Sequence, residues 1–279
     1  MEMRLRDVEF QVDTSLHPFF WESISTKPWE TGTFDVIDQF VQPGDSVADI
    51  GCWMGPISLY LAGKGARVYA ADPDPTAYKA FQSNLSLNPT LSTLITPHHL
   101  AIAPQRGTFT LYARTGYGNS SSSLLARTRD QVQDSTTLGL TLAEFMEQNA
   151  VARFSLIKLD IEGGEFALAE QLLALKQADR YGHLLLSMHY DHLNESIYQQ
   201  QIFGRWLSKA FMKVERITGR YLFRRRLRQT LEPIVSLCRQ FPYVYTMEGQ
   251  RLSPEQLSAQ QLLRSGADLF LADQPWEMI

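Results

Sequence analysis

Residues 46–62, SVADIGCWMGPISLYLA, constrain the fold more than any other part of the chain. The apolar run at their start predicts a buried strand, and the spacing of Ile57, Tyr60 and Leu61 predicts a helix. A short turn with two glycines joins them. A strand that passes through a glycine turn into a helix is the unit of open α/β sheets, which bind ligands at such turns. We therefore expect a ligand to lie against this turn.

Apolar runs and helical patterns alternate along most of the chain. This alternation predicts βαβ units, and hence an α/β fold with a mostly parallel central sheet and helices on both faces. Strands are expected at 46–51, 66–72, 92–103, 107–114, 154–161 and 183–190, with a final pair at 243–247 and 268–273. Helices are expected at 56–63, 75–88, 141–148 and 164–177.

Length and charge narrow the classes of protein. A chain of 279 residues can bury one large core. The net charge of -4 gives no general attraction to nucleic acid or to an anionic membrane. Cys52 and Cys238 lie far apart and predict neither a disulfide framework nor a metal-ligand set. No stretch approaches the roughly 20 apolar residues of a membrane span, and the first residues lack the apolar core of a signal peptide. A cytoplasmic location is expected.

The turn differs from that of dinucleotide-binding proteins. Their G-x-G-x-x-G pattern lets the main chain approach a pyrophosphate, but here only Gly51 fits, since Trp53 and Pro56 replace the other glycines. An NAD-dependent oxidoreductase is therefore a weaker interpretation. Asp72 follows the second strand, where a carboxylate accepts hydrogen bonds from ribose hydroxyls. S-adenosylmethionine, a nucleoside with an amino-acid tail and no phosphate, fits both features. The alternative is that the glycines serve packing alone.

The sequence resembles the FkbM-type methyltransferases over residues 29–190. The resemblance rests on WETGTFDVIDQF, DSVADIGCWMGPISLYLA, VYAADPDPTAYKAFQSNLSLNP, HHLAIAPQRG, SSSSL, TLAEFM and FSLIKLDIEGGEF, in that order. It implies a Rossmann-like class I methyltransferase fold with S-adenosylmethionine as methyl donor and S-adenosylhomocysteine as product. It also implies methylation of a hydroxyl group.

The resemblance assigns a donor site as well. It implies that the methionine pocket is shaped by Asp49, Gly51 and Gly55, that the ribose is bound by Asp72, and that the adenine is flanked by main chain near Leu100 and Ala101. Asp160 is implied to lie close to the reactive methyl group. Many relatives carry Glu where this chain has Asp72, and the shorter carboxylate still reaches a ribose.

Transfer of a methyl group to a hydroxyl needs a group that takes or shares the hydroxyl proton. Asp160 and Glu162 stand at the end of one buried strand, and His189 ends another. We expect His189 to be the base and Asp160 to orient the base or the substrate, with Glu162 as a further catalytic candidate. The alternatives are that His189 only caps its strand and that Glu162 caps the next helix.

A divalent metal is a second way to activate the hydroxyl. Asp160, Glu162, Asp191 and His192 offer oxygen and nitrogen donors that could hold Mg²⁺ and lower the pKa of the acceptor. Their spacing does not require the side chains to converge on one ion, so a site without metal is the preferred prediction.

Two segments are candidates for covering the donor. Glu30 follows Trp29 ahead of the first core strand and is a candidate donor-binding residue. Trp29 could instead pack with Phe19, Phe20 and Trp21 over a sheet edge. The polar stretch GYGNSSSS could close over the donor as a lid or form a mobile surface loop.

Arginines gather in RYLFRRRLRQTLEP, which has helical periodicity. Arg224, Arg228 and His192 are candidates for binding an acceptor that carries a negative charge, and the alternative is a solvated helix face. The run is too short to favour nucleic acid. The expected acceptor is a saccharide or another small molecule. The alternative function is a non-catalytic module that binds S-adenosylmethionine and docks a partner through the arginines.

The expected organisation has four parts. They are an N-terminal cap at 1–40, the donor-binding core at 41–190, a helical insert near the acceptor site at 191–232, and a C-terminal helix and strand pair that completes the sheet at 233–279.

Overall fold

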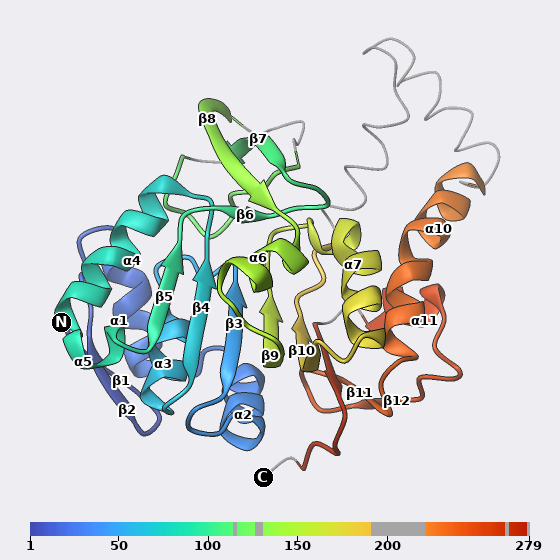
Figure 1. The fold of residues 1–279 in the computed structure, drawn as a ribbon, viewed down its shortest axis with the longest axis horizontal. Helices are drawn as coiled ribbons and strands as arrows, with labels where there is room; N and C mark the ends of the chain where they lie inside the picture. The colour runs from blue at the N-terminus through green and yellow to red at the C-terminus, as the bar shows by residue number, and fades with distance from the viewer. Residues whose placement is uncertain (114–115, 126–130, 191–220, 266–267, 278–279) are drawn as a thin grey trace.

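The computed structural model describes residues 1–279 with the exception of 114–115, 126–130, 191–220, 266–267 and 278–279. Within the described part, an eight-stranded sheet with the order β12-β11-β13-β10-β9-β3-β4-β5 forms the centre of the molecule (Figure 1). Its strands are β3 Ser46–Ile50, β4 Arg67–Ala71, β5 Ile95–His98, β9 Phe154–Leu159, β10 Tyr181–Leu186, β11 Tyr243–Thr246, β12 Arg251–Leu252 and β13 Leu269–Ala272.

Most of this sheet is parallel. β10, β9, β3, β4 and β5 pair in parallel, whereas β13 pairs antiparallel with β10 and β11 antiparallel with β13. The chain places β4 and β5 on one side of β3 and then β9 and β10 on the other. The strand order therefore reverses between β3 and β9, where open α/β sheets hold their ligands. The expected Rossmann-like α/β fold and the final strand pair are confirmed.

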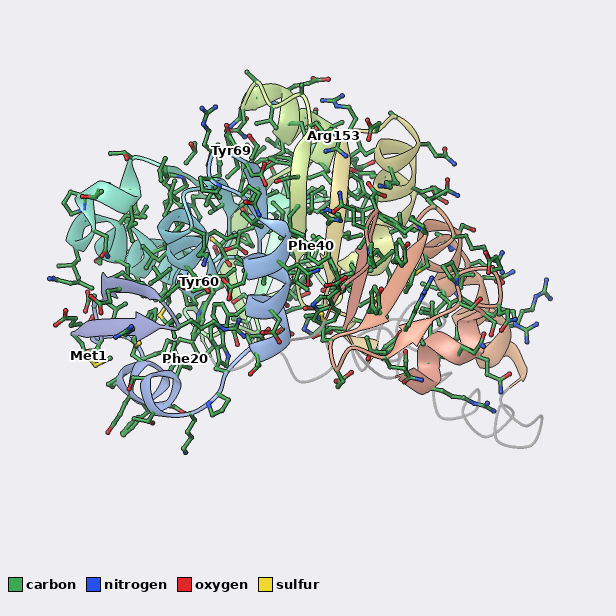
Figure 2. All side chains as sticks on the ribbon, turned by 90° about the horizontal axis from the view of Figure 1, so that it is seen from below. Met1, Phe20, Phe40, Tyr60, Tyr69 and Arg153 are labelled. Carbon is green, nitrogen blue, oxygen red and sulfur yellow. The ribbon has the colours of Figure 1, made fainter. Side chains whose placement is uncertain are left out.

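Helices cover both faces of the sheet, as expected. Their bounds are α1 Pro18–Thr26, α2 Thr31–Phe40, α3 Pro56–Gly63, α4 Pro75–Leu87, α5 Pro89–Ser92, α6 Leu142–Gln148, α7 Glu165–Gln177, α10 Tyr221–Cys238 and α11 Ala259–Ser265. Val47 of β3 packs in a core with α1, α2 and α3, whereas its neighbour Ala48 packs in a second core with α6, α7 and α10. Phe40 of α2 meets Phe270 of β13 edge-on, with ring centroids 4.8 Å apart, so the helix lies directly on the sheet (Figure 2).

Two of the described helices, α4 and α6, begin at residues whose side chains cap them. Asp74 accepts hydrogen bonds from the main-chain nitrogens of Thr76 and Ala77 and starts α4. Thr141 and Glu144 form a capping box at the start of α6. Local sequence therefore sets these boundaries close to where the periodicity predicts them.

The prediction of one strand over 92–103 is wrong. β5 ends at His98, and Ala101–Ile102 forms the separate strand β6. Pro97 lies in β5, which is the edge strand, so its missing N–H costs no bond on the open side. The chain then leaves the sheet, and β6 pairs with a different partner.

Two smaller sheets were not predicted as such. β6 belongs to a three-stranded sheet with β7 Gly107–Ala113 and β8 Gln131–Leu140, which lies above the carboxyl ends of the central strands (Figure 1). β1 Glu2–Leu5 and β2 Val8–Gln11 form an N-terminal hairpin whose alternate residues are buried. Among the described helices, none has the length and apolar character that a bilayer crossing requires.

Candidate active site

A cavity of about 460 Å³ lies at the carboxyl ends of β3, β4, β9 and β10. Predicted site residues from separate parts of the chain line it, namely Glu30, Asp49, Gly51, Asp72, Leu100, Ala101, Asp160, Glu162 and His189. Small-molecule sites have volumes of roughly 300–1,000 Å³. The structure therefore brings most of the predicted donor and catalytic residues to one cavity of suitable size.

The glycine turn after β3 forms one wall of the cavity. Gly51 and Gly55 have φ angles of +80° and +81°, and Trp53 between them has 52°. A Cβ on Gly51 would overlap the main-chain oxygen of Asp160, and one on Gly55 would overlap the ring of Phe81. Gly51 lines the cavity, whereas Gly55 packs behind the turn and is not among the lining residues. Glycine is thus required at both positions for close approach and for backbone conformation.

Asp72 stands just beyond β4 and is bound to the same turn. Its Oδ2 accepts a hydrogen bond of 2.8 Å from the main-chain nitrogen of Trp53, and its Oδ1 one of 2.9 Å from that of Asp74. Burial, with the charges of Asp74 and Asp49, raises the pKa of Asp72 to about 7. The carboxyl is therefore held in a fixed orientation at the cavity wall, and its protonation changes near neutral pH.

Lys158 is a site residue that the sequence reasoning missed. Its Nζ lies 3.3 Å from Oδ2 of Asp160 and 3.7 Å from Oδ1 of the fully buried Asp49. Burial alone would lower the pKa of Lys158, but the charges of Asp160, Asp49 and Glu30 outweigh burial and raise it. Lys158 and Asp160 are two residues apart in the extended segment IKLDIEG, so their side chains point to the same face. This spacing could have identified Lys158 from the sequence.

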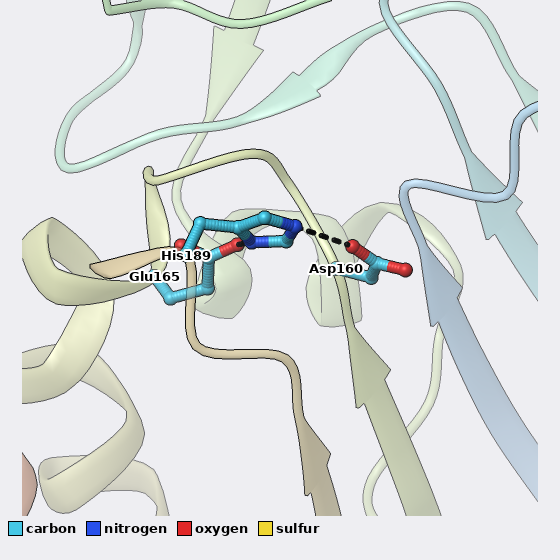
Figure 3. A group of neighbouring side chains, drawn as sticks. All are labelled: Asp160, Glu165 and His189. Atoms are coloured by element: carbon cyan, nitrogen blue, oxygen red, sulfur yellow. Dashed lines mark hydrogen bonds and ion pairs between the residues drawn. The ribbon is translucent and has the colours of Figure 1, made fainter. Parts of the chain in front are cut away.

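His189 lies three residues beyond the end of β10, at the centre of a group of carboxylates (Figure 3). Its Nδ1 lies 2.9 Å from Oε1 of Glu165, and its Nε2 lies 3.6 Å from Oδ1 of Asp160 and 3.7 Å from Oε1 of Glu162. Burial lowers the pKa of His189, but the hydrogen bond to Glu165 and the three negative charges raise it to about 9. At neutral pH the unliganded imidazole is therefore protonated.

Glu165 is the second residue that the sequence reasoning missed. It is fully buried in the first turn of α7, where its Oε1 also accepts a hydrogen bond of 2.9 Å from the main-chain nitrogen of Ile161. Its Oε2 has no hydrogen-bond partner among the described residues. Glu165 was expected only as part of a helix, because an acidic residue in a first helical turn is ordinarily a surface residue.

Among the charged side chains that line the cavity, acidic groups outnumber basic ones. Among the described residues six carboxylates line it, from Glu30, Asp49, Asp72, Asp160, Glu162 and Asp268, against the two cationic side chains of Lys158 and His189. Asp268 was not predicted, and its Oδ1 accepts a hydrogen bond of 2.8 Å from the main-chain nitrogen of Met188. A cavity with this balance attracts a positively charged ligand.

Three aromatic rings also line the cavity. Phe20, Trp29 and Trp53 line the cavity, and Phe20 contacts both tryptophans edge-on at ring-centroid distances of 5.4 and 4.6 Å. Trp29 therefore packs in an aromatic cluster and lines the cavity at once. Phe19, which was expected in the same cluster, is 83% exposed.

The loop that contains GYGNSSSS contributes to the cavity lining and is hydrogen-bonded to neighbouring segments. Asp74 Oδ2 accepts hydrogen bonds from the main-chain nitrogen of Gly118 at 2.8 Å and from Oγ of Ser122 at 2.6 Å. The main-chain oxygen of Gly118 accepts one of 2.7 Å from the indole nitrogen of Trp53 and lies 2.8 Å from Nε2 of His17. The loop lines the cavity through Asn119, Ser120, Ser122 and Ser123. Hydrogen bonds therefore hold this loop in place as part of the cavity lining.

The predicted acceptor residues are less well placed. Arg228 is exposed on α10 and does not line the cavity. His192 and the side chain of Arg224 lie outside the described residues, as does Asp191.

Two carboxylates and His189 are close enough together to act as ligands of one metal ion. One ligand atom each from Asp160, Glu165 and His189 lies within 4.8 Å of the others. The ammonium of Lys158 lies 3.3 Å from Oδ2 of Asp160, so a metal ion bound by Asp160 would stand close to an existing positive charge.

The chain matches one protein-family model and is similar over short segments to curated methyltransferases. The family model described as "Methyltransferase FkbM domain" matches residues 45–196. A ribosomal protein L11 methyltransferase of a Nitratiruptor species is 42% identical over 57 residues, which are 20% of this chain and 20% of that protein. A tRNA (guanine(37)-N(1))-methyltransferase of Phytophthora infestans is 35% identical over 60 residues, 22% of this chain and 14% of that protein. The match thus covers about a fifth or less of these curated relatives.

Two solved structures are similar to the chain at low sequence identity and low TM-score. The methyltransferase FkbM of Methylobacillus flagellatus KT is 16% identical with a TM-score of 0.36, over 53% of this chain and 33% of that one. A putative rRNA methylase of Clostridium thermocellum is 12% identical with a TM-score of 0.38, over 64% of this chain and 83% of that one.

Proposed function

The chain belongs to the FkbM methyltransferase family, and from this we propose that it transfers the methyl group of S-adenosylmethionine to a hydroxyl of a saccharide or another small molecule. S-adenosylhomocysteine is the product left by the donor. One observation carries the proposal. The charged group of Lys158, Asp160 and His189 opens onto the same cavity as the Gly51 turn and Asp72.

Donor binding follows from the shape and charge of the cavity. Asp72 accepts hydrogen bonds from the ribose hydroxyls, and the main chain at Gly51 leaves room for the methionine part. Apolar side chains next to Leu100 and Ala101, among them Ile102 and Phe109, enclose the adenine. A donor with a sulfonium and an ammonium carries the positive charge that the acidic lining favours.

The chemistry needs alignment and the removal of one proton. The hydroxyl oxygen attacks the methyl carbon, the carbon–sulfur bond breaks with its electron pair going to sulfur, and the hydroxyl proton must leave. His189 takes this proton at Nε2, and Asp160 orients the hydroxyl. Because the free imidazole is protonated at neutral pH, donor binding must first favour its neutral form, and a sulfonium charge in the cavity acts in that direction.

The acceptor is bound beside the aromatic rings that line the cavity. Phe20, Trp29 and Trp53 offer apolar ring faces to the C–H side of a sugar, while the carboxylates accept hydrogen bonds from its hydroxyls. The named relatives act on ribosomal protein L11 and on tRNA, so a macromolecular acceptor is the second candidate. A phosphate backbone is disfavoured beside this acidic lining, which supports a neutral or cationic acceptor over RNA.

Two other functions fit less well. A nicotinamide dinucleotide needs main-chain amides free for its pyrophosphate, but the nitrogen of Trp53 is bound to Asp72. A non-catalytic donor-binding module would not require His189 to be surrounded by carboxylates in the cavity.

Calorimetric titration with S-adenosylhomocysteine and NAD tests the donor. Wild type and Glu147→Ala, which changes an exposed carboxylate on α6, are expected to bind the nucleoside and ignore NAD, whereas Asp72→Ala loses binding. Equal binding by Asp72→Ala would overturn the donor site. The acceptor class is tested by mass spectrometry of products from neutral sugars, amino sugars, L11-type protein and tRNA incubated with S-adenosylmethionine.

A further inference from the structure

Glu165 is a buried carboxylate that the proposed reaction does not yet use. It is fully buried, and its Oε1 lies at hydrogen-bond distance from Nδ1 of His189 and from the main-chain nitrogen of Ile161. Enclosing a carboxylate is costly, and one of its oxygens finds no partner among the described residues. A residue kept only to start α7 would gain more at the surface, where water completes its hydrogen bonds.

The bond to Glu165 determines which nitrogen of His189 faces the cavity. Because Nδ1 points to a carboxylate, it carries a proton in both the charged and the neutral ring. The lone pair of the neutral ring is then on Nε2. This nitrogen lies 3.6 Å from Oδ1 of Asp160 (Figure 3). Both residues line the cavity. The ring is thus turned and protonated as a base for the acceptor requires.

From this geometry we propose that Glu165 is a positioning residue, which holds the His189 ring in place and fixes its Nδ1–H form so that Nε2 receives the acceptor proton. The inference deepens the proposed methyl transfer and rests on it. When the hydroxyl oxygen forms its bond to the methyl carbon, the electron pair of the carbon–sulfur bond goes to sulfur and the proton goes to Nε2. The resulting imidazolium is stabilised by Glu165 and returns its proton to water after the products leave.

Other charges around the ring affect the same proton. The groups that face it are Glu165 from α7, Asp160 and Glu162 after β9, and Asp268 before β13, while Lys158 pairs with Asp160. Asp160 and Glu162 are partly exposed, so the positive charge of a bound donor offsets their negative charges. Glu165 is buried, so the donor offsets its charge less. Glu165 therefore keeps its hydrogen bond with Nδ1 of His189 when the donor is bound.

The direct test needs no variant. Nitrogen-15 chemical shifts of His189 in the wild-type protein, with and without S-adenosylhomocysteine, report the tautomer as pH is raised through the ring's titration. We expect the neutral ring to carry its proton on Nδ1. A proton on Nε2 would overturn the inference, whatever the acceptor turns out to be.

The second test uses Glu165→Gln, with Glu170→Gln on the exposed face of the same helix as control. We expect Glu165→Gln to bind S-adenosylhomocysteine within about threefold of wild type, to lower kcat by about tenfold or more, and to lower the pKa of His189. Glu170→Gln leaves all three unchanged. In a His189→Gln background, Glu165→Gln is expected to cause no further loss of kcat.

The outcomes separate the two proposals. A wild-type protein that binds no donor and transfers no methyl group refutes the proposed function. An active wild type whose rate, pH profile and His189 pKa are unchanged in Glu165→Gln refutes only the positioning role. Equal losses from Glu165→Gln in the presence and absence of His189 would also refute it, because that result identifies a purely structural effect.

Discussion

The main chain of Gly51 lies directly against the main-chain oxygen of Asp160, and a Cβ at position 51 would overlap that oxygen. The contact arises because β3 and β9 pair in parallel. The pairing extends one residue beyond β9, where the main-chain nitrogen of Asp160 donates a hydrogen bond of 3.0 Å to the main-chain oxygen of Ile50. The glycine turn after β3 and the end of β9 therefore form one continuous wall of the cavity. A substitution that displaces the main chain of one is expected to displace the other.

The Gly51 contact predicts a strong effect of Gly51→Ala. We expect a lower melting temperature and loss of S-adenosylhomocysteine binding, because the residue has φ +80° and the added Cβ meets main chain. Gly44→Ala is the matched control, since Gly44 has φ +90° but no described atom within 4 Å of its Cβ position. The control should lose only the conformational contribution, about 1–2 kcal/mol, and keep binding. Similar behaviour of the two variants in calorimetry would contradict the role of the contact.

Donor binding is predicted to become tighter as pH rises from 6 to 8. Burial raises the pKa of Asp72 to about 7, so the free carboxyl is largely protonated at pH 6. Ribose hydroxyls donate to the ionised form and lower this pKa, so binding near pH 6.5 releases a proton. Calorimetry of S-adenosylhomocysteine in buffers of different ionisation enthalpy measures this release. In Asp72→Asn the release should be absent, and an unchanged release would assign it to another group.

His189 is predicted to stabilise the folded chain below pH 9. Its folded-state pKa of about 9 exceeds the ordinary histidine value of 6.5. The contribution is therefore complete below pH 6.5 and is lost as pH rises through 9. Denaturant unfolding of wild type and His189→Gln should show a difference that shrinks from pH 6 to pH 9.5. A difference that is constant with pH would mean that folding does not raise the pKa of His189.

The same variant has a catalytic prediction. His189→Gln should retain S-adenosylhomocysteine affinity and lower kcat by roughly 10²-fold, the effect of losing a general base. Turnover is measured with the acceptor identified in the screen. Unchanged turnover would mean that water or Asp160 takes the proton.

Lys158→Met is predicted to destabilise the core. The substitution leaves Asp49 buried without a nearby positive charge, which costs about 3–5 kcal/mol for a buried ion pair. The double variant with Asp49→Asn should recover part of this loss, since the uncompensated charge is then gone. Thermal unfolding of the four combinations measures the coupling. Additive losses would indicate that Lys158 acts through packing.

The loop that contains GYGNSSSS gives a matched pair of variants. Ser122→Ala removes the hydrogen bond to Asp74 and should speed dissociation of S-adenosylhomocysteine by about fivefold, equivalent to about 1 kcal/mol. Ser121→Ala changes the neighbouring residue, which does not line the cavity, and should leave dissociation unchanged. Stopped-flow displacement measures both rates. Equal rates for the two variants would show that the bond to Asp74 does not retain the donor.

Much of the cavity wall around the glycine turn could be predicted from the sequence, because it depends on contiguous residues. The strand, the glycine turn and the helix after it lie within residues 46–62, and Asp72 ends the next strand. The carboxyl ends of parallel strands meet at one edge of a sheet, so the position of Asp160 near this turn also followed. The break between β5 and β6 did not follow, because an apolar run does not reveal that its two halves pair with different sheets.

Tertiary structure alone brought Glu165 and Asp268 to the segment that carries His189. Glu165 is 24 residues away along the chain, and Asp268 reaches Met188 across 80 residues. These contacts depend on how α7 and the segment before β13 pack against the end of β10, which local periodicity does not specify. A charge that looks like a surface residue in the sequence thus becomes a buried partner, since burial is set by the packed elements and not by the residue type.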